Sequence, residues 1–144
     1  MIQILTGIQN TAAALDAEHT RLDVISQNIA NAHTTHDVNG QPYQRQVVVF
    51  ETALKNALNS DGSTGANLPA IQVAKIARDT RPPLQVYDPG NPEANAQGMV
   101  SMPNVNIHEE MADLISASRT FEANLAVVKN ARAMAMQTLS IGRH

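Results

Sequence analysis

The sequence contains no cysteine and no tryptophan, and aromatic residues make up only 3% of its 144 residues. The absence of cysteine excludes disulfides, thiolate metal ligands and a cysteine nucleophile. The scarcity of aromatic rings removes the side chains that supply much of the buried area in compact cores and catalytic pockets. Aliphatic residues, alanine and methionine must therefore form the core, which favours helices that pack closely along their length.

The chain also lacks a basic patch and a long apolar run. Its net charge is −3, and the ten basic residues are scattered without interleaved aromatics, which disfavours nucleic-acid binding. No apolar run approaches the roughly 18 residues that span a bilayer, so we expect no membrane insertion. The first ten residues, MIQILTGIQN, lack a basic region followed by a continuous apolar one, so we expect no cleaved signal peptide.

A helical pattern extends over residues 2–32. Four apolar residues recur at intervals of seven: Ile8, Leu15, Leu22 and Ile29. Ile25 lies one helical turn before Ile29. This spacing is typical of a seam between packed helices. At a rise of ~1.5 Å per residue, such a helix would be roughly 45 Å long.

A second long helix is predicted from Asn106 onward. Asn106 and Glu109 form a variant of the capping box, Pro103 precedes them, and Gly142 provides a stop. The seam residues of this helix step by three, four or seven: Met111, Leu114, Phe121, Leu125, Val128, Ala135 and Leu139. The helix would be roughly 50 Å long. A compact globule of this chain length has a radius of gyration of only ~15 Å, so the two helices must pack on each other and on something else.

Both helices carry many alanines outside the seams: Ala13, Ala14, Ala17, Ala112, Ala117, Ala123, Ala126, Ala131 and Ala133. Small side chains let backbones approach closely, so we interpret these faces as surface for neighbouring subunits. The alternative is a solvated face in which alanine serves only helix propensity.

The middle third of the chain changes to a strand pattern. Four segments indicate strands, namely residues 43–50, 70–77, 83–87 and 99–102. Asn39-Gly40 predicts a turn, and NSDGSTGAN at 59–67 predicts a mobile loop. The predicted fold is α+β: antiparallel N- and C-terminal helices form a coiled-coil-like pair, with a small β-rich insert between them. The expected boundaries are 1–35, 36–104 and 105–144.

Motifs that carry chemistry are incomplete. His108 opens a match to the zinc motif H-E-x-x-H, but Ala112 stands where the second histidine is needed. His33 and His36 have ligand spacing, but no third ligand is evident apart from Asp37 in a turn-like segment. We therefore predict no catalytic, cofactor-binding or metal-binding residues and no enzymatic activity. A site assembled from distant residues stays open as an alternative.

Several motifs resemble a known family. RLDVISQNIANAHTT, at 21–35, resembles the N-terminal signature of flagellar rod and hook proteins. Residues 86–142 resemble the FlgC family of proximal rod subunits through Tyr-Asp-Pro-Gly, Met-Pro-Asn-Val-Asn and Ser-Ala-Ser-Arg-x-x-Glu-Ala-Asn. DVNGQPYQRQVVVFE is also similar, and the resemblance is weakest between Thr52 and Leu68.

These motifs contain mostly polar residues that we expect at subunit interfaces: Gln27, Asn28, Asn31, Pro103, Asn104, Asn106, Ser118, Arg119 and Asn124. Local capping at the helix end is the alternative for the amides at 27–31. The sequence also leaves open whether Asn28 or Asn31 pairs with Arg119.

The resemblance implies a structural subunit of the bacterial flagellar proximal rod, the drive shaft of the basal body. The terminal helices would form the inner domain that lines the rod channel, with the insert outside. The expected partners are further copies of the chain, other proximal rod proteins, the rod adaptor, the distal rod protein and the flagellar type III export apparatus. The chain would be exported through that apparatus and would sit in the rod where it crosses the periplasm. The ends of an isolated chain would become helical only on assembly.

Three alternatives to this function remain. The first is another rod or hook subunit of the same superfamily. The second is a soluble helical binding or export adaptor, and the third is an enzyme with a cryptic site.

Overall fold

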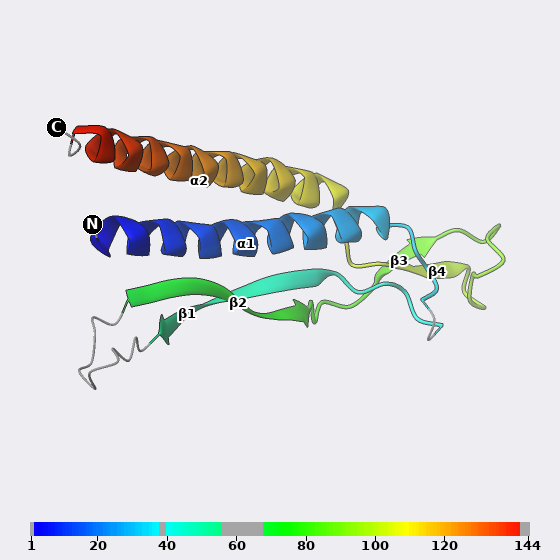
Figure 1. The fold of residues 1–144 in the computed structure, drawn as a ribbon. Coiled ribbons are helices and arrows are strands. Elements are labelled where there is room, and N and C mark those ends of the chain that lie inside the picture. Colours follow the sequence, from blue (N-terminus) through cyan, green and yellow to red (C-terminus); the bar gives the residue numbers. More distant parts are fainter. Residues whose placement is uncertain (1, 38–39, 56–67, 142–144) are drawn as a thin grey trace.

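The computed structural model describes residues 2–37, 40–55 and 68–141 (Figure 1). The elements follow in the order α1 (Ile2–Ala30), β1 (Gln46–Lys55), β2 (Leu68–Arg78), β3 (Leu84–Tyr87), β4 (Met99–Met102) and α2 (Ile107–Ile141). The α+β class is confirmed, with two long helices and small antiparallel sheets between them. All four predicted strands are present. The predicted loop at 59–67 and the stop at Gly142 lie outside the described residues.

Helix α1 lies between α2 and the β1–β2 hairpin (Figure 1). Helix α2 runs back along α1 in the opposite direction, so the two ends of the chain lie at the same end of the molecule (Figure 1). The β3–β4 pair lies beyond the opposite end, where the chain leaves α1 and enters α2. The hairpin therefore packs along α1 as a third layer.

The two sheets are simple antiparallel pairs. β1 pairs with β2 from Gln46↔Arg78 to Lys55↔Leu68, with a register shift between Val49 and Phe50. β3 pairs with β4 from Leu84↔Met102 to Tyr87↔Met99. The turn before β4 requires Gly98, which has a φ of 74°. A Cβ there would also approach the Tyr87 ring to 3.0 Å.

Local hydrogen bonds account for the start of α2 and for the end of α1. The Asn106 Oδ1 accepts a hydrogen bond of 3.1 Å from the backbone N–H of His108, and its Nδ2 donates to Glu109. The predicted start of α2 is therefore confirmed. At the end of α1, the Asn31 Nδ2 donates to the carbonyl of Gln27 (2.8 Å), and its Oδ1 accepts from the Thr34 hydroxyl.

Small residues form most of the core: Ala17, Val24, Ile25, Ala32, Val100 and Ala117. Ala17 of α1 and Ala117 of α2 are buried within the chain, so the prediction that they face neighbouring subunits is wrong for these two. They are buried because helices of one chain approach closely where side chains are small. Over the described residues, neither helix has a stretch apolar enough to cross a bilayer.

Candidate assembly interface

A buried amide joins three parts of the chain. Asn28, on α1, is 1% exposed, and the side chain makes four hydrogen bonds. Its Nδ2 donates to the Gln46 carbonyl (2.8 Å) and to the Glu110 Oε2 (3.0 Å). Its Oδ1 accepts from the Tyr43 hydroxyl and from the backbone N–H of Gln46, both at 2.9 Å. An asparagine side chain has two donors and a two-lone-pair acceptor, so Asn28 is fully satisfied.

A buried ion pair adjoins this amide. Glu110, in the first turn of α2, is 0% exposed, and its Oε1 accepts a hydrogen bond from the Arg45 Nε. The Arg45 guanidinium also lies 3.6 Å from a carboxylate oxygen of Asp79 and 3.6 Å from one of Asp113. A buried carboxylate needs such partners because its desolvation is costly. We call Asn28, Tyr43, Arg45, Gln46 and Glu110 the polar junction.

The backbone around the polar junction is held in the same way. The backbone N–H of Arg45 donates to the Asn104 Oδ1 (2.8 Å), and the Asn104 Nδ2 donates to the carbonyl of Arg81 (2.9 Å). Arg81 in turn forms a two-nitrogen pair with the Asp79 carboxylate. The segments before β1, after β2 and before α2 therefore meet at one place.

These contacts shift the pKa values of Tyr43 and Asp79. Burial raises the pKa of the Tyr43 phenol, and the nearby Glu110 carboxylate raises it further. The hydrogen bonds from Arg81 lower the pKa of the Asp79 carboxyl. Both shifts favour the protonation states that the hydrogen bonds require, so the polar junction is a structural link at neutral pH.

The side chains of the polar junction bond to one another and to the backbone, which is a structural role. Among the described residues, no group of three histidine, aspartate, glutamate or cysteine side chains is placed to hold a metal ion. The His36 Nδ1 lies 2.9 Å from the Glu93 Oε1, and His33 is exposed. A cleft of about 320 Å³ beside the polar junction is lined by Val24 and Ile25 as well as by charged groups.

The predicted seam residues differ in burial. Ile25 is buried, whereas Ile8, Leu15, Leu22, Ile29, Leu114, Phe121 and Val128 are half-buried. Three members of the α2 seam are exposed in the single chain: Met111, Leu125 and Leu139. The most buried positions of α1, Ala17, Val24 and Asn28, lie on a different side of the helix from Leu15 and Leu22.

The polar residues of the motifs also differ. Five are engaged inside the chain: Asn28, Asn31, Asn104 and Asn106 through the bonds above, and Pro103 by burial. Four lie nearer the surface: Gln27 and Arg119 are exposed, and Ser118 and Asn124 are half-buried. Asn28 does not pair with Arg119, because both ends of its amide bond to the polar junction. Asn31 adopts the local capping role.

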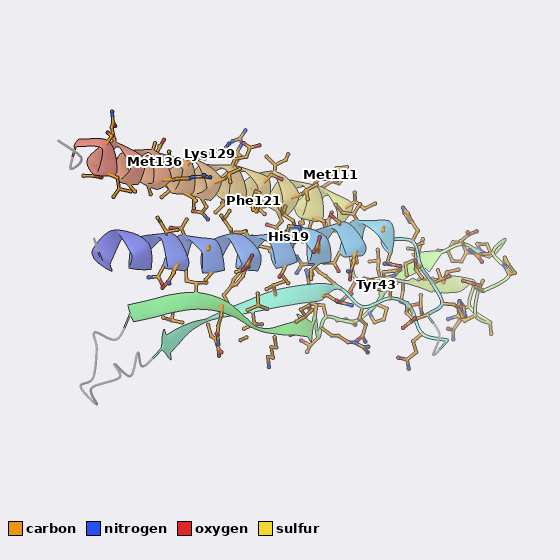
Figure 2. The ribbon with its side chains drawn as sticks, in the orientation of Figure 1. His19, Tyr43, Met111, Phe121, Lys129 and Met136 are labelled. Carbon is orange, nitrogen blue, oxygen red and sulfur yellow. The ribbon has the colours of Figure 1, made fainter. Side chains whose placement is uncertain are left out.

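Large apolar side chains are exposed along most of α2. Large exposed side chains extend from its first turns almost to its end: Met111, Ile115, Leu125, Val127, Met134, Met136 and Leu139. Figure 2 shows Met111, Lys129 and Met136 spaced along this helix. Met134 and Met136 are 61% and 63% exposed. By the helical step, Val127 and Met134 lie on nearly the opposite side of α2 from Met111 and Met136, so apolar side chains are exposed on two sides of the helix. Exposed apolar surface of this kind marks an interaction site.

Sequence reasoning missed four members of the polar junction: Tyr43, Arg45, Gln46 and Glu110. A signal for Glu110 was present, because it continues the inward stripe of Leu114, Ala117 and Phe121 by a helical step of four. A carboxylate on an inward stripe requires a partner. The sequence offers no comparable signal for Arg45.

Comparisons with known proteins connect this geometry to a family. Residues 8–35 match the family described as "Flagella basal body rod protein", and residues 96–141 match "Flagellar basal body rod FlgEFG protein C-terminal". The flagellar basal-body rod protein FlgC of Bacillus subtilis strain 168 is 40% identical over 141 residues, which cover 92% of this chain and 94% of the relative. The FlgC of Yersinia enterocolitica is 38% identical and covers 99% of this chain and 100% of itself. That of Salmonella typhimurium is 37% identical, with 91% and 92% covered.

Proposed function

The chain belongs to the FlgC family of flagellar basal-body rod proteins, and we propose that its paired helices form the inner, channel-lining part of the proximal rod. The chain is a structural subunit of the rod, is located in the flagellar basal body and assembles with other rod components. The proposal specifies which surfaces of the chain contact other rod components and by which route the chain reaches the rod.

The exposed apolar side chains of α2 are the observation that carries the proposal. Between residues 124 and 140 of α2, where burial is described, no residue is buried, whereas the first half of the helix holds Glu110 and Ala117. A helix that is covered on one side by α1 alone leaves Leu125, Met134 and Met136 in water. Because these side chains are already partly covered, their full burial against other helices would contribute about 1–2 kcal/mol each. Neighbouring subunits supply these helices in the proposed rod.

In the assembled rod, α1 and α2 form a coiled-coil-like pair. The predicted seam residues of both helices lie in that pair or between it and its neighbours, including Met111 and Leu139. The inner unit comprises residues 1–35 and 105–144, and residues 36–104 form the outer insert. The polar junction supports this division because it ties the insert to both helices at one end.

The proposed role of the chain is structural and involves no catalysed reaction. We propose that it has no enzymatic activity and binds no cofactor, nucleic acid or membrane. Its partners are further copies of itself, the other proximal rod proteins, the rod adaptor and the distal rod protein. It reaches them through the flagellar type III export apparatus, and the ends of the helices fold fully only when neighbours cover them.

Complementation with purification of basal bodies tests the proposal. A strain without the chromosomal copy should recover swimming and contain the chain in purified basal bodies when the wild-type copy is returned. A variant with Met134 and Met136 both changed to Asp should be produced but absent from basal bodies, because two charges would then replace buried apolar contacts. A matched control changes exposed Thr80 and Gln97 of the insert to Asp. Normal incorporation of the double methionine variant would contradict the assignment of this surface.

A further inference from the structure

The β3–β4 hairpin projects from the rest of the molecule. It lies beyond the end of the helix pair at which α1 ends and α2 begins (Figure 1). Among the described elements, neither β3 nor β4 packs against a helix or against the β1–β2 hairpin. We call residues 84–102, which comprise the two strands and the loop between them, the arm. The position of the arm is therefore set by its base and by contacts with irregular segments of the chain.

The base of the arm is held by side chains that the polar junction also uses. The Asn104 side chain accepts from the backbone N–H of Arg45 and donates to the carbonyl of Arg81. Pro82 and Pro83, which lead into β3, have no N–H group that could extend the β3–β4 ladder toward this point. The arm is thus fixed at its base but is not bonded by a ladder over its whole length.

The arm is bonded internally as one body. Its two strands pair over four residues each, from Leu84↔Met102 to Tyr87↔Met99. In the loop, the side-chain oxygens of Asn91 and Asn95 accept hydrogen bonds of 2.9 or 3.0 Å from backbone N–H groups of the same loop. Asparagine stabilises turns in this way. A contact at the tip can therefore control the direction of the whole arm.

An ion pair ties the tip of the arm to the segment that follows α1. The His36 Nδ1 lies 2.9 Å from the Glu93 Oε1, and the two side chains are 56% and 36% exposed. The pair lies at a cavity of about 240 Å³ between the two parts of the chain. Its lining includes Thr35, His36 and Pro42 on one side and Glu93, Asn95 and Val100 on the other. Val100 is 3% exposed, which adds an apolar contact that does not depend on pH.

The charges around His36 favour its protonated form over its neutral form as a partner for the arm. Glu93 faces it from the arm, and Asp37 follows it in the chain. No other ionisable residue lines the cavity in the part of the chain that the structure describes. A hydrogen bond between two charged groups is roughly twice as strong as one between neutral groups. A histidine ordinarily gains its charge as pH falls through about 6.5, and a glutamate keeps its charge down to about pH 5.

We propose that the arm pivots at its base and that His36 and Glu93 latch its tip to the segment after α1, more tightly as pH falls from about 8 to about 5.5. The latched arm binds one more proton than the open arm, so the latch is strongest when His36 is protonated and weakens as pH rises. An exposed pair contributes modestly, so pH shifts the balance between latched and open arms without removing either. The latch sets how the arm presents Tyr87, which is 70% exposed, to its surroundings.

The distance between the arm and α1 tests the latch. Because the chain has no cysteine, nitroxide labels can be placed on Gln27→Cys of α1 and Gln97→Cys of the arm, both exposed positions, in the purified full chain. Double electron–electron resonance then measures the distribution of that distance at about pH 5.5 and about pH 8. We expect the ratio of latched to open molecules to be about twofold to fivefold higher at the lower pH. Identical distributions at the two pH values would overturn the inference.

Variants of the pair separate charge from shape. His36→Gln and Glu93→Gln should each give the distribution rich in open arms at both pH values, and the two changes together should add nothing further. His36→Arg keeps a positive charge at both pH values, so it should give the distribution rich in latched arms throughout. His19→Gln is the matched control, because it removes another exposed histidine–carboxylate pair, 3.3 Å from Asp23 on α1, and should keep the pH response. A wild-type pH response in His36→Gln, or its loss in His19→Gln, would overturn the inference.

The latch and the proposed function fail in distinguishable ways. The distance measurement uses the free chain, so an unchanged distribution would remove the latch and leave the role in the rod intact. Absence of the wild-type chain from purified basal bodies would remove the proposed function and leave the latch intact.

Discussion

Asn28 and Glu110 are 82 residues apart in the sequence, and their side chains meet in a buried hydrogen bond of 3.0 Å between α1 and α2. Both also hold the start of β1, Asn28 through Gln46 and Glu110 through Arg45. This single place therefore fixes the register of the two helices and the position of the hairpin. The far half of the helix pair has no equivalent among the described residues, since its side chains there are largely exposed.

Replacement of the buried amide should destabilise the chain. Asn28→Ala removes four hydrogen bonds and leaves the backbone of Gln46 and one oxygen of Glu110 unsatisfied. We expect the free energy of unfolding to fall by about 2–4 kcal/mol, measured by denaturant unfolding of the purified chain. Asn31→Ala is the matched control, because its bonds are local, and it should cost about 1 kcal/mol or less. Equal losses in the two variants would contradict the central place of Asn28.

The Glu110 charge should matter more than other carboxylates of α2. Glu110→Gln keeps the shape and one oxygen that can accept from Arg45, but it removes the charge and faces the Asn28 Nδ2 donor with a second donor. The carboxylates that remain near Arg45 are Asp79 and Asp113, each at 3.6 Å. We expect a loss of about 2–3 kcal/mol, below the full cost of breaking a buried pair because these partners remain. Glu122→Gln, at an exposed site on the same helix, should stay within about 0.5 kcal/mol of wild type. If Glu110→Gln matched that control in thermal unfolding, the ion pair would be irrelevant to stability.

The polar junction predicts a dependence on alkaline pH. Burial raises the pKa of Tyr43 above its ordinary value of 10.0, so the folded chain keeps a proton that the unfolded chain releases. The free energy of unfolding must then fall as pH rises above about 10. Denaturant unfolding between pH 8 and 11 measures this slope. Tyr43→Phe should remove it and Tyr87→Phe, at an exposed site, should retain it; a persistent slope in Tyr43→Phe would assign it to another group.

Close approach of the two helices should be sensitive to added volume. Ala117 is fully buried, so Ala117→Leu would force α1 and α2 apart or distort the side chains around it. We expect a loss of about 1–3 kcal/mol in the free energy of unfolding. Ala123→Leu, an exposed position of the same helix, should be nearly neutral. Tolerance of both changes would mean that Ala117 does not set the helix spacing.

The features that could be predicted from the sequence are those set by residues close together in the chain. The capping of α2 by Asn106 depends on residues within one turn, and the strands are marked by their own composition and turns. Alternation and capping chemistry operate over a few residues, so a single sequence displays them. The α+β class followed from these signals together.

The polar junction could not be predicted because its bonds cross long stretches of chain. Arg45 reaches Glu110 across 65 residues, and the small inward residues Ala17 and Ala117 resemble the exposed alanines beside them. The heptad pattern of α1 also did not indicate that a hairpin covers the helix from a second side. The contacts of Met111, Leu125 and Leu139 stay predictions, since they depend on neighbouring subunits.

Oxidation of two methionines tests most directly the claim that the exposed apolar side chains of α2 are buried by assembly. Met134 and Met136 are 61% and 63% exposed in the single chain and should react readily with peroxide when the purified chain is free. In purified basal bodies the same two side chains should react at least about tenfold more slowly, as followed by mass spectrometry, because neighbouring helices exclude the oxidant. Equal oxidation rates in the free chain and in basal bodies would contradict the account.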